Sequence, residues 1–152
     1  MPLYTNAENV IREHLELVAN GGRPHRVTIG ELNASQLASL NADRVTRGFG
    51  PLNGLVFFRG KHIYERRMLC DGYTVEDIIM QIRSAFSEHS VTNFNPKMSS
   101  LRNPIEWQDQ YGNRVKDEVV LECFANHPRA EIYSVIPKGD KIKPPRTPPK
   151  EG

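Results

Sequence analysis

The spacing of apolar residues changes near residue 90, and this change limits what the chain can fold into more than any other feature. Before residue 90 most apolar residues recur every three to four positions, which is typical of amphipathic helices. After residue 90 they alternate with polar residues, which is typical of strands with one buried face. This order predicts an α+β fold with N-terminal helices and an antiparallel β-meander of about four strands. We expect a helix to pack on one face of that sheet.

Three segments are predicted to be helical. In the first, residues 6–19, Thr5 and Glu8 have the spacing of a capping box, and two glycines after Asn20 end the helix. Residues 33–41 predict a short second helix. The third prediction is the strongest, because a capping pair precedes a continuous apolar stripe. The capping pair and the stripe are Thr74 with Asp77, followed by Val75, Ile78, Ile79, Ile82 and Phe86.

The predicted strands are short and separated by turn-forming residues. Residues 55–60 are apolar and aromatic, which fits either a buried strand or an extended entry to the next element. Gly112-Asn113 and residues 126–129 are typical hairpin turns. The predicted strands are residues 25–30, 55–60, 97–103, 105–110, 115–125 and 129–137.

The chain divides into three regions by composition. Residues 1–50 form an N-terminal helical and extended region, and residues 51–137 form the α+β core domain. Residues 138–152 carry five Lys or Arg against one Asp and one Glu, with four prolines among the last nine residues. Such a segment cannot form a helix or a central strand, so we expect a basic tail that is extended or disordered.

Length and charge exclude several classes of protein. A chain of 152 residues is long enough for one domain with a hydrophobic core. It has no apolar run approaching the ~18 residues of a membrane span, and its N-terminus lacks the pattern of a secretory signal. We therefore expect a cytoplasmic protein, or one that leaves the cell without that signal, and no membrane partner. The net charge of +2 is small, so any attraction for a polyanion depends on local basic stretches.

No metal or cofactor is predicted. Cys70 and Cys123 belong to no zinc-binding pattern, and we expect both to be reduced packing residues; a disulfide between them stays open if the protein is exported. The chain has no P-loop, GxGxxG, GxSxG or HExxH motif. Nucleotide-dependent, zinc-dependent and serine-hydrolase chemistry therefore has no support.

The most organised chemistry lies in the segment FFRGKHIYERR. If residues 61–69 are helical, His62 and Arg66 lie one turn apart on the same face, with Lys61 and Arg67 beside them. An imidazole can move a proton near pH 7, and a guanidinium matches the oxygens of a phosphate. These groups suffice to cleave RNA without a metal. The alternative interpretation is a histidine hydrogen-bonded to a neighbouring group, with ordinary surface arginines.

The last predicted strand can add groups to such a site. Alternation places Ser134 on the face with the apolar residues, and Arg129 and Tyr133 on the other face. Lys138 follows the strand and could reach a backbone phosphate. Arg129, Glu131 and Tyr133, an arginine, a carboxylate and a phenol on one face, are typical of a phosphate-binding cleft, and they are equally typical of any solvated sheet face.

The motif KHI with Arg66, followed by a capped helix and a late meander, resembles the barnase–EndoU–colicin–RelE superfamily of metal-independent ribonucleases, in its phage and polymorphic-toxin branch. The resemblance covers about residues 55–138. It implies that His62 is the general base or acid and that Lys61 and Arg66 contact the phosphate. It also implies that Ser134, in the late strand, positions the phosphate.

The sequence thus predicts a toxin-like endoribonuclease with His62, Arg66 and Ser134 as catalytic residues. The substrate-binding residues would be Lys61, Arg67, Arg129, Tyr133 and Lys138. The partners would be RNA and a cognate inhibitor or immunity protein. The alternative is a non-enzymatic interaction module, either a toxin-neutralising protein or a phage accessory protein.

Overall fold

The change of periodicity corresponds to a change from helices to strands in the computed structural model of the chain. The structure describes residues 3–87, 93–95, 100–109, 111–123 and 130–137. In the first part, three helices and a helical turn alternate with two strands, and the second part consists of strands. The elements are α1 (Ala7–Ala19), β1 (Val27–Glu31), α2 (Ala34–Thr46), β2 (Leu55–Phe58), α3 (Lys61–Ile63), the π-helix η1 (Tyr64–Cys70), α4 (Val75–Ala85), β3 (Asn93–Asn95), β4 (Ser100–Gln108), β5 (Arg114–Glu122) and β6 (Ala130–Pro137).

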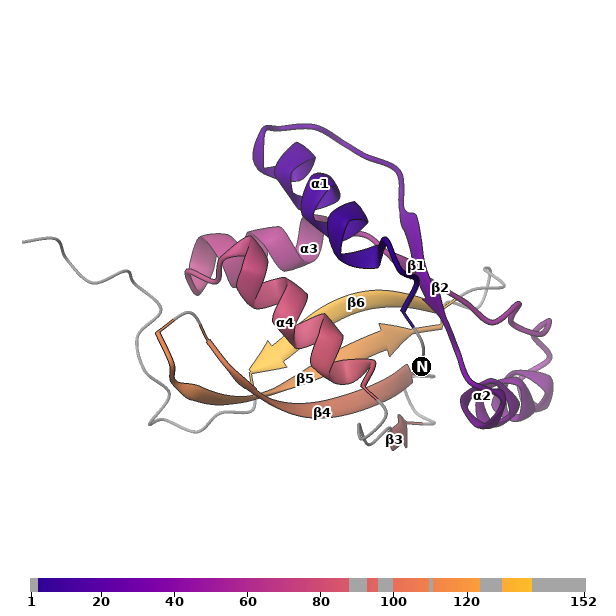
Figure 1. Ribbon diagram of the computed structural model, residues 1–152. Coiled ribbons are helices and arrows are strands. Elements are labelled where there is room, and N and C mark those ends of the chain that lie inside the picture. The colour runs from indigo at the N-terminus through magenta and orange to yellow at the C-terminus, as the bar shows by residue number, and fades with distance from the viewer. Residues whose placement is uncertain (1–2, 88–92, 96–99, 110, 124–129, 138–152) are drawn as a thin grey trace, which may run out of the picture.

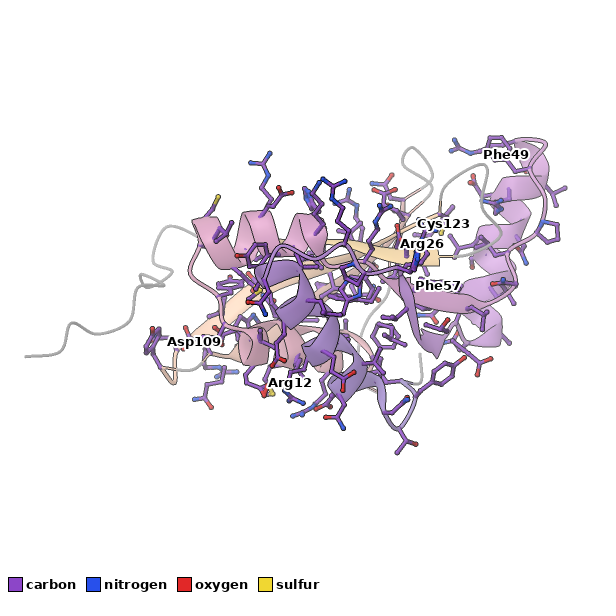
Figure 2. All side chains as sticks on the ribbon, turned by 90° about the horizontal axis from the view of Figure 1, so that it is seen from above. Arg12, Arg26, Phe49, Phe57, Asp109 and Cys123 are labelled. Carbon is purple, nitrogen blue, oxygen red and sulfur yellow. The ribbon has the colours of Figure 1, made fainter. Side chains whose placement is uncertain are left out.

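The α+β class is confirmed, and the sheet is larger than predicted. Its described strands lie in the order β1-β2-β6-β5-β4-β3, so there are six rather than about four. All neighbours are antiparallel except β2 and β6, which are parallel. The helices α1, α3 and α4 lie on one side of the sheet, and α2 lies at its end (Figure 1). In Figure 2, Asp109 at the β4–β5 turn and Phe49 after α2 mark opposite ends of the molecule.

The strand β1 belongs to the same sheet as the strands of the predicted core. It pairs with β2, and α1 packs on both β1 and α4. Two exposed ion pairs also join α1 to α4: Arg12 with Glu76 and Glu8 with Arg83. The predicted boundary at residue 50 therefore lies within a continuous structure in which residues from both sides share one sheet and one hydrophobic core.

The strand β4 replaces two predicted strands. The sequence predicts two strands, residues 97–103 and 105–110, on either side of Pro104, yet β4 continues through this proline. On one side β4 pairs with β5 along its whole length, but on the other side β3 covers only Ser100–Arg102. Pro104 lies beyond that cover, where the edge of β4 needs no N–H donor. The three-residue strand β3 was not predicted.

Helix caps explain where the helices begin. The predicted capping box of α4 is confirmed: Thr74 Oγ1 accepts from the backbone N–H of Asp77, and the Asp77 carboxylate accepts from the N–H of Thr74. The helix α2 has a similar box between Asn33 and Gln36, and it runs five residues further than expected, to Thr46. The predicted box at Thr5 is wrong, because α1 begins after Asn6 without a side-chain cap.

The inner face of the sheet packs on α1 and α4 through apolar side chains. The isoleucines of both helices and Leu15 of α1 are buried, as the helical periodicity predicted, whereas Leu17 of α1 is exposed. The buried residues meet valine, leucine and isoleucine residues on the inner face of β5 and β6. The most buried of these are Ile11, Leu15, Ile78, Ile82, Val119, Leu121 and Ile132, each 0% exposed.

A buried carboxylate on β5 joins three other parts of the chain. The Oδ2 atom of Asp117 accepts hydrogen bonds from Trp107 Nε1 at 2.6 Å, Gln81 Nε2 at 2.7 Å and Tyr73 Oη at 3.2 Å. All four side chains are buried. Because these donors come from β4, α4 and the segment before α4, Asp117 fixes how α4 lies on the sheet.

We expect Asp117→Ala to destabilise the fold by about 3 kcal/mol or more, because each buried donor left without an acceptor costs about 1–3 kcal/mol. The control is Glu106→Ala, which removes a carboxylate that pairs with the exposed Arg114 and should cost less than about 1 kcal/mol. Urea unfolding measures both. Equal losses for the two variants would contradict a central role for Asp117.

Candidate functional site

The predicted helical segment from Lys61 is present, but most of it is a π-helix. The α-helical turn Lys61–Ile63 continues directly into η1. π-Helices are rare and are often found at functional sites. At the C-terminal end, the N–H of Gly72 donates to the carbonyl of Met68 and Gly72 has a φ of 73°, which ends the segment.

His62 lies beside two arginines, as the spacing predicted. Its side chain is half-buried. Burial lowers the pKa of His62 below its usual 6.5, and the positive charges of Arg66 and then Arg67 lower it further. The imidazole is therefore mostly neutral at pH 7 and able to accept a proton.

The two arginines differ in their surroundings. Arg66 is exposed and makes no ion pair within the part of the chain that the structure describes. Arg67 is half-buried and pairs with the carboxylate of Asp71, one turn further along the segment. Arg66 is thus the guanidinium that is available to a ligand, and Arg67 is held in place.

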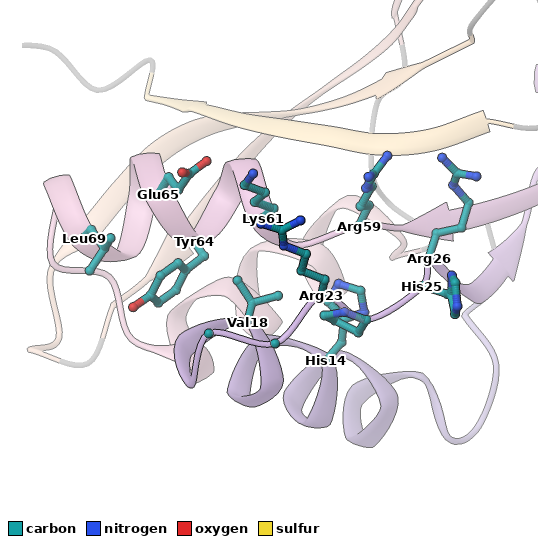
Figure 3. Close-up of a pocket in the computed structure, with 13 residues that line it drawn as sticks. His14, Val18, Arg23, His25, Arg26, Arg59, Lys61, Tyr64, Glu65 and Leu69 are labelled. Atoms are coloured by element: carbon teal, nitrogen blue, oxygen red, sulfur yellow. The ribbon is translucent and has the colours of Figure 1, made fainter.

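A pocket of about 580 Å³ lies between α1, the α1–β1 loop and the α3–η1 segment. Figure 3 shows its apolar and aromatic side chains, Leu69 and Tyr64, at one end, with Arg59, Arg26 and His25 at the other. Arg23 and Lys61 lie between these ends. The pocket therefore has a cationic end and an end where Tyr64 and Leu69 lie beside one carboxylate, Glu65.

The positive charges in the pocket are poorly compensated. Arg26 pairs with Glu131, with 2.7 Å between Nε and Oε1. Within the described residues, Arg23, Arg59 and Lys61 make no ion pair, and Glu65 is the acidic residue that lines the pocket. Like charges held together in this way attract an anion.

His14 joins the two walls of the pocket. Its ring is buried, contacts Phe58 edge-on at a centroid distance of 5.3 Å, and accepts a hydrogen bond at Nε2 from the N–H of Gly60 at 2.9 Å. Burial lowers the pKa of His14, and the positive charge of Arg59 lowers it further. The ring is therefore neutral, which Nε2 requires in order to accept the hydrogen bond.

The lowered pKa of His14 predicts a stability that depends on pH. As the pH falls below the usual histidine pKa of 6.5, the unfolded chain binds a proton before the folded one does, so the free energy of unfolding falls. His62 acts in the same direction. We expect His14→Gln to reduce the loss of stability between pH 7.5 and pH 5, and His14→Gln with His62→Gln to reduce it further. Urea unfolding across this range checks this, and an unchanged slope in both variants would contradict it.

Gly60 allows the start of α3 to approach α1 closely. A Cβ atom at this position would lie 2.8 Å from Leu15 Cδ2 and 3.0 Å from His14 Cδ2. Both contacts are shorter than van der Waals distance, and both atoms belong to buried side chains. The absence of a side chain at Gly60 therefore sets how closely the start of α3 approaches α1.

We expect Gly60→Ala to destabilise the protein by about 1–3 kcal/mol, because the added methyl group overpacks the core. Gly50→Ala is the matched control, since a Cβ atom there meets nothing within 4 Å, and it should change stability by less than about 1 kcal/mol. Thermal unfolding compares the two. A Gly60→Ala protein as stable as the Gly50→Ala protein would show that the close approach is unimportant.

The structure brings some of the predicted site residues together. Lys61, His62, Arg66 and Arg67 lie on one helical segment, and Lys61 lines the pocket. His62 and Arg66 are not among the residues that line it.

The helical turn α3 contacts the strand β6. The register of β6 is irregular: Leu121 pairs with Ile132 and Val120 with Ser134, which leaves Tyr133 without a partner in β5. Arg129 and Lys138, like the predicted turn at residues 126–129, lie outside the described residues.

Sequence reasoning missed the arginines of the pocket and its central histidine. Arg23, Arg26 and His14 belong to the N-terminal region, and Arg59 was counted only as part of a basic stretch. The sequence feature that could have indicated these residues is the segment GGRPHR, residues 21–26, in which a glycine pair and two arginines come just before a strand. Its meaning depends on the pairing of β1 with β2, which places Arg26 and Arg59 next to the first paired residues, Val27 and Phe58.

The cysteines and potential metal ligands provide no further site. Both thiols are free; Cys123 is buried, and burial raises its pKa to about 12, whereas Cys70 is exposed rather than packed. Within the described residues, no three His, Cys, Asp or Glu side chains could together hold a metal ion. In that part of the chain, none of the helices combines the length and the apolar character that crossing a membrane requires.

Comparison of the chain with family models, curated proteins and solved structures gives no significant match.

Proposed function

We propose that the protein is a metal-independent endoribonuclease that acts through His62. The observation that carries this proposal is the mostly neutral imidazole of His62 beside the exposed guanidinium of Arg66. Both lie on the α3–η1 segment, which also lines the cationic pocket. A neutral imidazole accepts a proton and a guanidinium binds phosphate oxygens. Both groups belong to one helical segment, in which His62 lies in α3 and Arg66 in η1.

In the proposed reaction, His62 takes the proton of a ribose 2′-hydroxyl and the 2′-oxygen attacks the adjacent phosphorus. The new P–O2′ bond forms as the P–O5′ bond breaks, and the leaving 5′-oxygen takes a proton from water. The hydroxide left behind takes the proton from His62, which returns to its neutral form. Arg66 stabilises the charge that develops on the non-bridging oxygens. The products are a 2′,3′-cyclic phosphate and a 5′-hydroxyl.

The remaining residues have supporting roles in this proposal. Lys61 and Arg67 would hold the substrate, Lys61 from the pocket wall. Since α3 contacts β6, we propose that Ser134 on β6 positions the reacting phosphate. Tyr133, Arg129 and Lys138, in and around the same strand, would contact the RNA.

One observation favours a second candidate function. His62 and Arg66 do not line the pocket, although Lys61 does. A protein that binds RNA or a protein partner through the pocket, without cleaving anything, fits that arrangement. Such a non-enzymatic module would be a toxin-neutralising or phage accessory protein.

Incubation with total RNA in EDTA separates the two functions. We expect wild-type protein to cleave RNA, and His62→Ala to cleave it about 10²–10⁴-fold more slowly, the usual contribution of a general base. Arg66→Ala should also be slow, whereas Arg114→Ala, an exposed arginine on β5, should be as active as the wild type. Mass spectrometry should find the cyclic phosphate as a product one water lighter than the linear phosphate.

Because the pKa of His62 is lowered, the rate should already be constant with pH at pH 7 and should fall only in more acid solution. The lack of cleavage by the wild type would refute the enzymatic proposal and leave the binding module. Cleavage that persists in His62→Ala would refute the role of His62.

A further inference from the structure

The charge of the pocket matches a phosphate group with two negative charges. Four cationic side chains line it against one carboxylate, Glu65. Glu131 compensates Arg26 from outside the pocket. With the histidines counted as neutral, a charge of +2 remains. A phosphomonoester carries close to two negative charges at pH 7, whereas each phosphodiester inside an RNA chain carries only one.

The volume of the pocket and the different side chains at its two ends indicate a ligand larger than a phosphate ion. A volume of about 580 Å³ lies in the range of small-molecule sites. The end opposite Arg59 and Arg26 contains Tyr64 and Leu69, with Glu65 beside them. Aromatic side chains stack on unpaired bases. A nucleotide has the same polarity, with a charged phosphate at one end and a flat base at the other.

The loop that closes the pocket is suited to a close approach of ligand. Gly21 and Gly22 line it without side chains, and Gly22 packs so tightly that a Cβ atom there would lie 2.8 Å from the carbonyl oxygen of Leu17. The tight packing of Gly22 on the end of α1 fixes the path of the loop that carries Arg23, and neither glycine places a side chain in the pocket.

We infer that the pocket is a subsite for the terminal nucleotide of an RNA chain, with its phosphomonoester among Arg23, Arg59 and Lys61 and its base against Tyr64. This inference rests on the proposed function in taking RNA as the polymer. It extends that function, because it assigns recognition of a chain end to a place that does not include His62 or Arg66.

Binding of short RNAs that cannot be cleaved tests the inference. The probes are hexanucleotides with 2′-O-methyl groups throughout and an internal fluorescent label, carrying a 5′-phosphate, a 3′-phosphate or no terminal phosphate. Fluorescence anisotropy in EDTA should show that one phosphorylated form binds at least ~10-fold tighter than the unphosphorylated form, the effect of about two charge-assisted contacts. The form that binds tighter identifies the chain end.

Substitutions in the pocket test whether its arginines cause the preference for a terminal phosphate. Arg23→Gln with Arg59→Gln should abolish the preference for the phosphorylated form. The matched control, Arg47→Gln with Arg114→Gln, removes the same charge from α2 and β5, away from the pocket, and should keep the preference. Tyr64→Leu should weaken binding of the oligonucleotide but leave competition by inorganic phosphate unchanged. Thermal unfolding confirms that each variant is folded.

Equal binding of all three hexanucleotides would overturn the inference, and so would a preference that survives in Arg23→Gln with Arg59→Gln. Competition by adenosine 5′-monophosphate distinguishes the sources of the phosphomonoester. Weaker binding of the mononucleotide than of the oligonucleotide supports an RNA end, and equal binding of the two would overturn the RNA end in favour of a free nucleotide.

The two proposals fail separately. His62→Ala should lose cleavage and keep the preference for a terminal phosphate. A wild-type protein without ribonuclease activity but with that preference would refute the enzyme and support the subsite. Cleavage without any preference for a terminal phosphate would do the reverse.

Discussion

The hydrogen bond between the backbone N–H of Gly60 and the buried ring of His14 holds together the two walls of the pocket. One wall is α1 with the loop that follows it, and the other is the α3–η1 segment. The bond forms only because Gly60 has no side chain and because His14 is neutral. The position of Lys61, which follows Gly60 directly, and the start of the segment that carries His62 depend on this contact.

Polar side chains form two different clusters, one around the buried Asp117 and one in the cationic pocket. In the core, the donors around Asp117 satisfy one buried carboxylate and fix α4 on the sheet. In the pocket, by contrast, Arg23, Arg59 and Lys61 have no acidic partner within the described residues. A completely paired group stabilises a fold, whereas unpaired charges of one sign are suited to binding. This difference is the reason to look for function at the pocket rather than at Asp117.

Local patterns predicted the local structure well. The capping pair of Thr74 and Asp77 and the apolar stripe after it are enough to place α4, because caps and helical periodicity act within a few residues. The same holds for the turn at Gly112. The split of β4 at Pro104 failed because the tolerance of a strand for proline depends on which neighbour covers its edge.

Contacts between distant segments explain what was not predicted at the site. The neighbours Lys61, His62 and Arg66 were found because they are close in sequence. Arg23 and Arg26 were not, since they reach the pocket only through the pairing of β1 with β2. The ion pair of Arg26 with Glu131 joins residues that are 105 positions apart, and no local pattern indicates it.

The position of β6 has a consequence for how the protein is made. Within the described residues this strand is the last along the chain, yet it lies between β2 and β5 and joins the β1–β2 pair to the β3–β4–β5 ladder. Until β6 has left the ribosome, these two parts of the sheet have no described strand to join them, and Glu131 is not there to pair with Arg26. A nascent chain therefore carries Arg26 without its acidic partner until β6 has been made.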